Sequence, residues 1–228
     1  MKHNLLAIDA STEALSLALH FKGNTFTHFE VCPQQHSQKI LPLVDALLSE
    51  ANCSLKDLDG IIYGRGPGSF TGVRIGVAVA QGLAYSAGLK LYGVSTLQAM
   101  AQEALQTQDC KEVISAIDAR MGEIYLGHFG TDEQGNAIAK QDEIVIKPET
   151  INEDFNGVKG VGTGWQTYSD DAKRLNVSVI ESVSLPNAQF MLAIGDIGFT
   201  NGDTVAAQDA QPHYVRDTVT WKKLPGRE

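Results

Sequence analysis

The sequence predicts a mixed α/β fold in which helices cover two sheets. Near the N-terminus, the runs "NLLAIDAS", "EALSLALHF" and "TFTHFEVC" are strand-like and joined by turn-like segments, which is typical of a β-meander. Helix-like and strand-like segments then alternate as far as about residue 106, a pattern of sheets packed under helices. A further pair of strand-like runs surrounds "DARMGE" and resembles a second meander, which indicates a second lobe.

The length and composition agree with this class. A chain of 228 residues fits one large unit or two coupled lobes. Its 43% hydrophobic and 20% charged residues are those of an ordinary globular protein, for which averages are about 45–50% and about 25%. The net charge of −9 argues against broad nucleic-acid binding, because neutralising phosphates needs clustered Lys and Arg. Any RNA contact would have to be local or shared.

The N-terminus and the cysteines point to the cytoplasm. The run "MKHNLLAIDAS" reaches Asp9 after a very short apolar stretch, which is no signal-peptide core and far below the roughly 20 residues of a membrane span. Cys32, Cys53 and Cys110 are odd in number and form no C-x-x-C pair, so neither a disulfide framework nor a zinc site is indicated.

After the meander, the period becomes helical between His36 and Ala51. Leu41 and Leu43 widen the apolar stripe, so this helix is apolar on more than one side. Pro42 lacks an N–H group and its ring strikes the preceding turn, so the regular helix is expected to begin near Leu41 or to be kinked there. The apolar positions at helical spacing are Ile40, Val44, Leu47, Leu48 and Ala51.

The following segments read as the strand "GIIYG", a Gly-Pro turn over 66–69, a helix over 70–87, the strand "LKLYGV" and a helix over about 96–106. We place the first lobe at residues 1–108 and the second at 109–228. In the second lobe, "NAQFMLAIGDIGF" reads as a helix and residues 209–228 as an extended tail.

The Gly-Pro turn lies within residues 60–102, which contain no carboxylate. It matches neither a P-loop, because no Lys follows, nor a dinucleotide fingerprint, because no acid follows at ribose distance. A strand, a glycine turn and a helix N-terminus with Arg65 and Arg74 nearby still suit an anion. The alternative is that Gly66 and Gly68 only shape a tight strand-to-helix turn.

The helix over 70–87 has one bare ridge and one mixed face. The ridge residues, four apart, are Gly72, Gly76, Ala80, Ala84 and Gly88. Another element can approach such a ridge closely, and packing within the chain is the simpler explanation. The opposite face consists of Arg74, Ala78, Gln81 and Tyr85. With one Tyr, one Arg and no acid, this face suits a partner surface.

A second candidate site is the turn that follows the first strand. A strand ending in Asp9, with Ser11 and Thr12 on a tight turn, can hold a carboxylate and hydroxyls at the phosphates and metal of a nucleotide. Taken alone, the same turn is also that of an ordinary hairpin. Together with the meander, this turn resembles the actin, sugar-kinase and heat-shock ATPase superfamily. More closely, "IDASTEALSLAL", "QHSQKILPLVDALL", "GRGPGSFTGVRIG" and "PHYVRDTVTWKKLPG" resemble the TsaB (YeaZ) family over essentially the whole chain.

The resemblance implies a two-lobed actin-like fold with a reduced second lobe. It also implies a non-catalytic scaffold that helps to make threonylcarbamoyladenosine in tRNAs, together with a larger paralogue, TsaD, and an ATPase, TsaE. In that family the helix pair over 36–51 and 70–87 packs against the same pair of the paralogue, and a homodimer could imitate this contact. The implied interface residues are Ile40, Leu41, Leu43, Val44, Leu47, Arg74, Ala78, Gln81 and Tyr85.

The resemblance further implies that any nucleotide site is vestigial, so that ATP or ADP binds only weakly or in the complex. That site would comprise Asp9, Ser11, Thr12, Gly66 and Gly68. The larger paralogue carries the metal on a motif resembling V-H-H-x-E-G-H, where this chain reads "VSTLQAM". In this chain, a threonine hydroxyl and a methionine thioether stand at the positions of the two metal-binding histidines. These groups cannot replace two imidazoles around a hard catalytic ion, so we expect neither a bound metal nor a catalytic site. The residues at the two histidine positions are Thr96 and Met100.

Other catalytic constellations receive little support. No two of the six histidines, among them His36, His128 and His213, stand at ligand spacing. A carboxylate set across the lobes, formed by Asp9, Asp118 and Glu123, is conceivable, but "SAIDARMGE" also reads as a hairpin turn. Two alternatives remain. One is a stand-alone ATP-dependent kinase or ATPase that uses the first turn, and the other is a glycoprotease-like metallopeptidase, which the VSTLQAM motif disfavours.

Overall fold

The computed structural model describes residues 1–216, and the predicted tail from residue 217 onward lies outside the described residues. Its first sheet has the strand order β3-β2-β1-β4-β5. The strands β1, β2 and β3 pair antiparallel in sequence, which confirms the predicted meander, and β4 and β5 continue the sheet parallel to β1. The bounds are β1 (Leu5–Asp9), β2 (Ala14–Phe21), β3 (Asn24–Val31), β4 (Gly60–Gly64) and β5 (Lys90–Val94).

The second sheet has the order β11-β10-β6-β7-β8, with β9 also paired to β7. The long hairpin β6–β7 is the predicted second pair of strands, with Asp118 opposite Ile124 near its turn. The bounds are β6 (Glu112–Arg120), β7 (Glu123–Thr131), β8 (Ala137–Ala139), β9 (Ile144–Ile146), β10 (Lys159–Val161) and β11 (Ser178–Val179).

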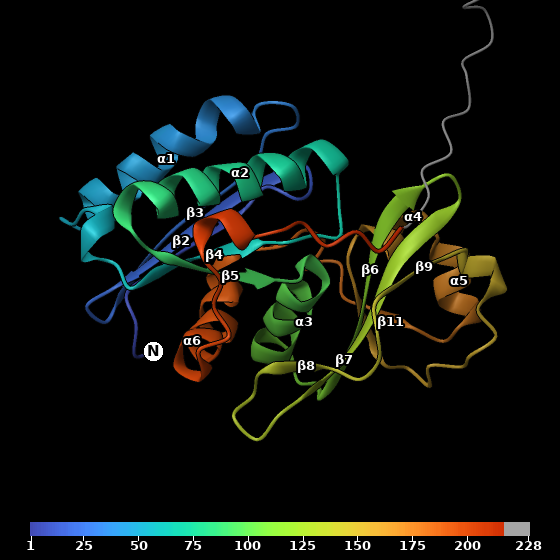
Figure 1. Ribbon diagram of the computed structural model, residues 1–228. Helices are drawn as coiled ribbons and strands as arrows, with labels where there is room; N and C mark the ends of the chain where they lie inside the picture. Colours follow the sequence, from blue (N-terminus) through green and yellow to red (C-terminus); the bar gives the residue numbers. More distant parts are fainter. Residues whose placement is uncertain (217–228) are drawn as a thin grey trace, which may run out of the picture.

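Helices cover both faces of the first sheet (Figure 1). On one face lie α1 (His36–Glu50) and α2 (Phe70–Ala87), and on the other lies α6 (Met191–Asn201). Every residue of β1 and β2 is buried, because both sheet faces are covered. The edge strand β3 instead alternates between exposed and half-buried residues from Thr25 onward.

The second lobe is smaller in its helical content. The short helices α4 (Thr163–Thr167) and α5 (Ser169–Arg174) pack beside β6, with the fully buried Trp165 at the centre of this core. The helix α3 (Thr96–Thr107) lies between the two sheets.

The structure draws the boundary between the lobes differently from the predicted division at residue 108. Helix α3 lies at the boundary, because Leu97 and Met100 pack in the core of the second lobe while Ala99 packs in the core on the first sheet. The chain then returns to the first sheet through the 3-10 turn at Ala188–Phe190, through α6, and through a further turn at Ala207–Asp209. Contacts between residues so distant in sequence leave no local signal.

Helix α1 begins at His36, so the alternative of a start near Leu41 is wrong. Pro42 lies inside the helix on its exposed side. There, water can bond to the carbonyl group that the missing N–H leaves free.

Helix α2 matches its predicted bounds. The Ser69 hydroxyl accepts a hydrogen bond from the Gly72 N–H at 3.3 Å, and Gly88 ends the helix in the left-handed region at φ 69°. A Cβ on Gly72 would lie 2.2 Å from the Ala10 carbonyl oxygen, and one on Gly76 would lie 3.5 Å from the Ala10 Cβ. The bare ridge of α2 therefore packs against the chain's own first strand and turn, which is the simpler of the two explanations given above.

Among residues 1–216, no helix combines the length and the apolar character needed to cross a bilayer.

Candidate functional site

The turn after β1 is a closed hydrogen-bonded unit. The Ser11 amide and hydroxyl both donate to Asp9 Oδ1, at 2.9 and 2.7 Å, and the Thr96 hydroxyl donates to Ser11 Oγ at 2.9 Å. All three residues are completely buried. Thr12 completes the turn by accepting from the Ala14 N–H at 3.3 Å. The predicted phosphate-binding side chains thus bond to the protein itself.

The Gly-Pro turn over residues 66–69, here called the glycine loop, packs directly against this turn. The Ser69 N–H donates to the Ser11 carbonyl oxygen at 2.7 Å, and a Cβ on Gly68 would lie only 2.2 Å from the same oxygen. Gly66 has φ 93°, which favours glycine. The structure therefore brings the five predicted cofactor residues together, in the arrangement expected if the glycines serve a tight strand-to-helix turn.

The second oxygen of Asp9 faces backbone rather than solvent. Asp9 Oδ2 is buried without a hydrogen-bond partner, and a Cβ on Gly64 would lie 2.0 Å from it. Burial raises the pKa of Asp9, against the lowering effect of the hydrogen bonds from Ser11. Both oxygens of Asp9 are therefore enclosed by the protein itself.

The positions that the resemblance aligns with metal-binding histidines have other contacts. Thr96 bonds to the turn, and Met100 packs in the core of the second lobe. Within residues 1–216, no group of three or more His, Cys, Asp and Glu side chains is placed to hold a metal ion.

The turns of the two meanders face each other across the lobes. Arg120, beside the β6–β7 turn, lies 3.5 Å from Glu13 of the first turn and 3.1 Å from Asp118. Glu123 pairs with Arg216. These carboxylates of the conceivable cross-lobe set, Asp118 and Glu123, are therefore held in ion pairs.

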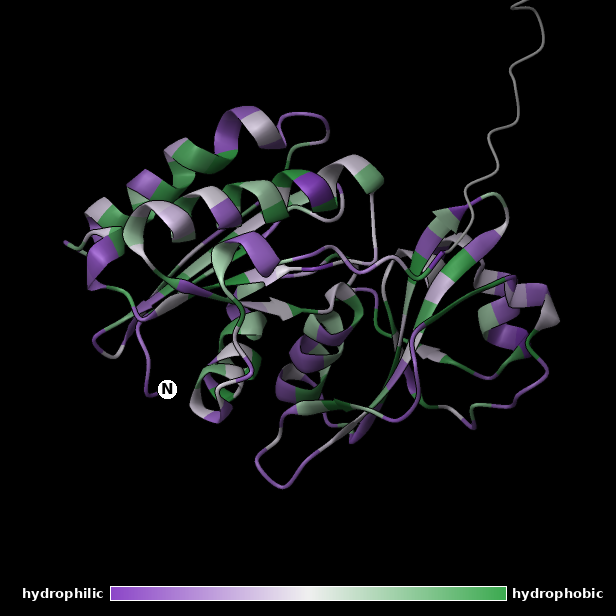
Figure 2. Ribbon diagram, viewed as in Figure 1, coloured by the Kyte–Doolittle hydropathy of each residue, from purple (hydrophilic) through white to green (hydrophobic). Residues whose placement is uncertain are grey.

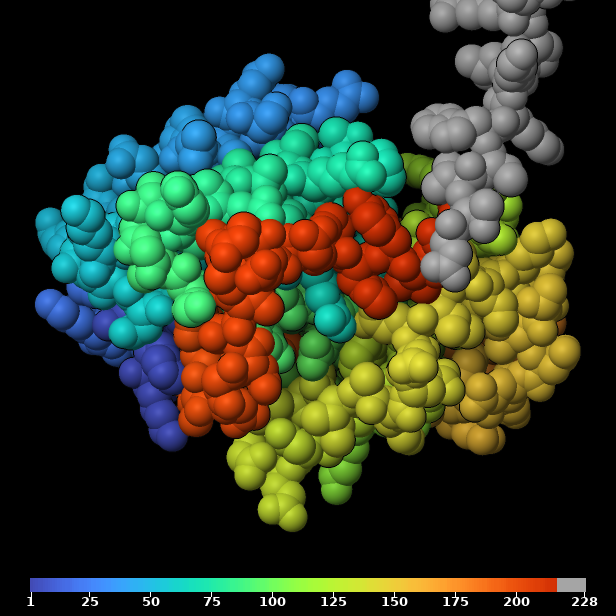
Figure 3. Space-filling model, viewed as in Figure 1, coloured from blue at the N-terminus to red at the C-terminus, as the bar shows by residue number. Residues whose placement is uncertain are grey.

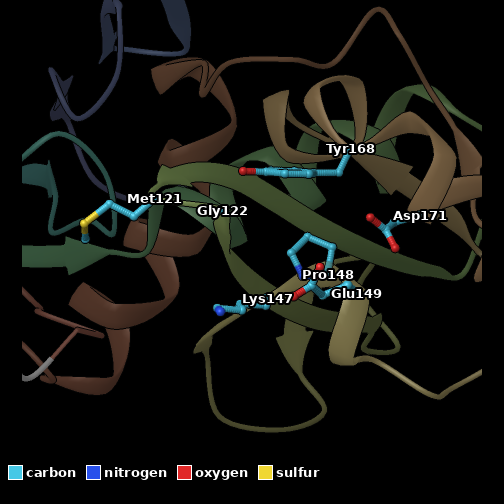
Figure 4. Close-up of a pocket in the computed structure, with 7 residues that line it drawn as sticks. All are labelled: Met121, Gly122, Lys147, Pro148, Glu149, Tyr168 and Asp171. Carbon is cyan, nitrogen blue, oxygen red and sulfur yellow. The ribbon is translucent and has the colours of Figure 1, made fainter.

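A shallow hollow of about 160 Å³ lies beside the β6–β7 turn, entirely within the second lobe. Figure 4 shows Tyr168, Pro148 and Asp171 gathered around it, with Met121 pointing away on the far side of Gly122. None of the residues predicted to bind a cofactor lines this hollow.

The predicted interface on α1 needs correction. Ile40, Val44 and Leu47 are 0%, 3% and 4% exposed, because the side of the helix that carries them packs onto the first sheet. These three implied interface residues are therefore buried within their own lobe. Leu41 is 51% exposed and Leu43 is half-buried, so these two leucines form the apolar part of the α1 surface.

On α2, the mixed face is partly covered by the chain itself. Arg74 Nε donates to the Tyr214 hydroxyl at 2.8 Å, and Gln81 Nε2 donates to the Ala210 carbonyl oxygen at 3.0 Å. Ala78 and Tyr85 stay exposed, with Tyr85 at 80%. Figure 2 shows the resulting mixed hydropathy along the two helices.

The covering segment, residues 205–216, is here called the strap; it includes the described part of the predicted extended tail, whose packing on the first lobe was not predicted. It begins where Val205 and Leu91 exchange both backbone hydrogen bonds, at 2.8 and 2.9 Å. The His213 N–H donates to the Arg65 carbonyl oxygen at 2.7 Å. Arg216 then bonds to the β6–β7 hairpin of the second lobe. Figure 3 shows this orange-red segment crossing the surface between α2 and the second lobe.

Comparison with known proteins decides the family. Residues 28–167 match the family TsaD, tRNA N6-adenosine threonylcarbamoyltransferase. The chain is 47% identical to the tRNA threonylcarbamoyladenosine biosynthesis protein TsaB of Escherichia coli, over 98% of the chain and 99% of that protein. The corresponding TsaB of Haemophilus influenzae is 42% identical, over 98% of each. The chain belongs to the TsaB (YeaZ) family.

Solved structures agree with this assignment. YeaZ from Pseudomonas aeruginosa superposes with a TM-score of 0.84 at 37% identity, covering 94% of this chain and all of that one. A second Pseudomonas aeruginosa structure, of a protein described as similar to peptidase YEAZ, gives a TM-score of 0.86 at 38% identity, over 95% of this chain and 100% of the other. The predicted actin-like fold is thereby confirmed.

Proposed function

We propose that this chain is a non-catalytic scaffold subunit of tRNA threonylcarbamoyladenosine biosynthesis that pairs with a TsaD paralogue and works with the ATPase TsaE. The biosynthetic role is supported by its TsaB relatives. Kinship with the proposed partner is supported by the match of residues 28–167 to the TsaD family. tRNA reaches the chain through the complex, and without the partner two copies pair through the same helices.

One observation carries the scaffold role: the turn that would have to hold a phosphate is filled by the chain's own groups. The amide donors of Ser11 and Ser69 and the hydroxyls of Ser11 and Thr96 are all used within the protein. A nucleotide could displace these bonds only at a cost of about 0.5–1.5 kcal/mol for each. We therefore propose that ATP or ADP binds weakly, or only within the complex.

The exposed residues of α1 and α2 form the proposed pairing surface. It comprises Leu41, Leu43, Ala78 and Tyr85, with Arg74 and Gln81 fixed by the strap at its border. Leucine and tyrosine side chains left in water on two adjacent helices mark a surface that gains stability when another chain covers it.

The pairing is tested with Ala78→Glu. Ala78 is exposed on α2, so the substitution leaves the core untouched and places a charge within the proposed contact. We expect at least a tenfold loss of affinity for the purified TsaD paralogue of the same organism in calorimetry, because a buried unpaired charge costs well over 1.4 kcal/mol. Reconstituted tRNA modification, measured by mass spectrometry of digested nucleosides, should fall in parallel.

The matched control is Gln141→Glu, which adds the same charge at an exposed position of the second lobe. It should bind the paralogue and support modification like the unaltered chain. If Ala78→Glu also binds with unaltered affinity, the interface lies elsewhere. Steady ATP turnover by the isolated chain, or one tightly held zinc or iron per chain, would overturn the non-catalytic role.

A further inference from the structure

The first sheet ends in an open and partly apolar edge. β3 is the outermost strand and pairs only with β2 in the described part of the chain. Phe29 and Val31, on one face of β3, are 46% and 60% exposed. The alternating residues of the other face lie toward α1, where Lys39 pairs with Glu30 at 2.7 Å. Edge strands of this kind normally carry a charge that discourages pairing, and the Phe29 face carries none.

A hollow of about 220 Å³, here called the β3 hollow, opens beside this edge. Phe29 and Val31 form one side of it, Glu103 of α3 forms another, and the loop over residues 182–187 forms the rest. None of these residues belongs to the closed turn or to the proposed pairing surface.

Among residues 1–216, Glu103 is the only charged residue that lines the β3 hollow. Among the described residues, no Lys, Arg or His lies within 4.0 Å of its carboxylate, and α3 contains no basic residue. Burial raises the pKa of Glu103 to about 7. The charged residues of β3, His28 and Glu30, lie on the opposite face of the strand from Phe29 and Val31.

We propose that the β3 hollow receives a lysine or arginine side chain of a partner protein, with Glu103 as its counter-ion. A long basic side chain combines an aliphatic stem with a cationic head. The stem fits against Phe29 and Val31, and the head meets the carboxylate of Glu103, which has no cationic partner among the described residues. The open edge of β3 offers backbone groups to the segment that carries this side chain. The net charge of −9 favours the approach of such a basic segment.

The test uses a matched pair of small probes: Nα-acetyl-lysine N-methylamide and its norleucine counterpart, which lacks the ammonium group. Each is titrated into the full isotope-labelled chain and followed by NMR. We expect the lysine probe to shift the resonances of Phe29, Val31 and Glu103, and to bind at least fivefold more tightly than the norleucine probe. Glu103→Gln, which keeps the size of the side chain, should remove that preference.

The control is Glu133→Gln, which removes a charge at an exposed position outside the hollow. The dissociation constant of the lysine probe should also fall as the pH rises from 6 to 8, because the carboxylate that binds it becomes charged, and Glu103→Gln should abolish this dependence. Equal binding of the two probes, or unaltered lysine binding by Glu103→Gln, would overturn the proposal.

One further outcome identifies a different occupant. The chain has its own adjacent lysines, Lys222 and Lys223, beyond the described residues. If replacing both by Gln raises the pKa of Glu103 in the full chain, the occupant is this segment, and the proposal of a partner protein is wrong. An unaltered titration of Glu103 supports an external side chain.

Discussion

Replacing Gly68 by Ala tests whether the glycine loop is shaped by the chain itself. The added Cβ would lie 2.2 Å from the Ser11 carbonyl oxygen and 3.0 Å from its carbon, both backbone atoms of a completely buried residue. Backbone cannot rotate away as a flexible side chain can. The loop or the turn must therefore shift, and the hydrogen bond from Ser69 to Ser11 must lengthen or break.

The expected loss of stability follows from these two effects. Overpacking of a tight contact costs about 1–3 kcal/mol, and the hydrogen bond contributes about 0.5–1.5 kcal/mol. Together they lower the free energy of unfolding by about 2–4 kcal/mol. For a chain of this length, about 2–4 °C of Tm accompanies each kcal/mol, so Tm should fall by roughly 4–16 °C.

The assay is thermal unfolding followed by circular dichroism, with Gly82→Ala as the control. Gly82 lies in the interior of α2, and no atom outside its helix comes within 4 Å of its Cβ position. Its replacement should raise stability by about 0.5–1 kcal/mol, because Ala favours the helix. An unaltered Tm for Gly68→Ala, accompanied by loss of nucleotide binding, would mean that the glycine makes room for a phosphate, and our interpretation of the loop would be wrong.

Two further predictions concern a buried acid and the strap. Folding raises the pKa of Glu103, so the wild-type chain should lose stability as the pH rises from about 4.5 through about 7, while Glu103→Gln should not. The Tm of the variant relative to the wild type should therefore increase from pH 5 to pH 8. A constant difference in Tm would contradict the assigned burial. Tyr214→Phe removes the hydroxyl that accepts a hydrogen bond from Arg74. The backbone amide hydrogen of His213 should then exchange with solvent at least threefold faster, with little change in Tm. An unaltered exchange rate would show that the contact between Arg74 and Tyr214 does not hold the strap.

The elements that the sequence predicts well are those with strong local signals. Helix α2 has a serine cap before it and a glycine in the left-handed region after it, and its bounds agree with the prediction. The meander strands carry their own alternation and turns. For α1, the apolar pattern covers more than one side. Whether Leu41 or Leu47 is buried depends on where the sheet lies, which no local pattern states.

The sequence predicts which residues meet at the candidate site, but not whether they form an open phosphate site or a closed turn. The spacing of Asp9, Ser11 and Gly68 brings a turn and a glycine loop together, and this holds equally for an open phosphate site and for a closed turn. The difference lies in how closely Gly68 approaches Ser11, a packing detail of the two backbones. The contacts of the strap were not predicted because they join residues far apart in sequence, such as Arg74 and Tyr214, which are 140 positions apart.

The strap also makes the proposed pairing surface part of a larger unit. Arg74 is held from two sides, by the Phe70 ring at 3.5 Å and by the Tyr214 hydroxyl at 2.8 Å, so the border of the α2 surface has a fixed shape. Two residues beyond Tyr214, Arg216 is bonded to Glu123 and to the Ala119 carbonyl oxygen in the second lobe. In the proposed complex, a partner on α1 and α2 would therefore abut a segment whose other end fixes the second lobe. Any shift of the strap on pairing would then reach the β6–β7 hairpin directly, because only one residue separates the two anchors.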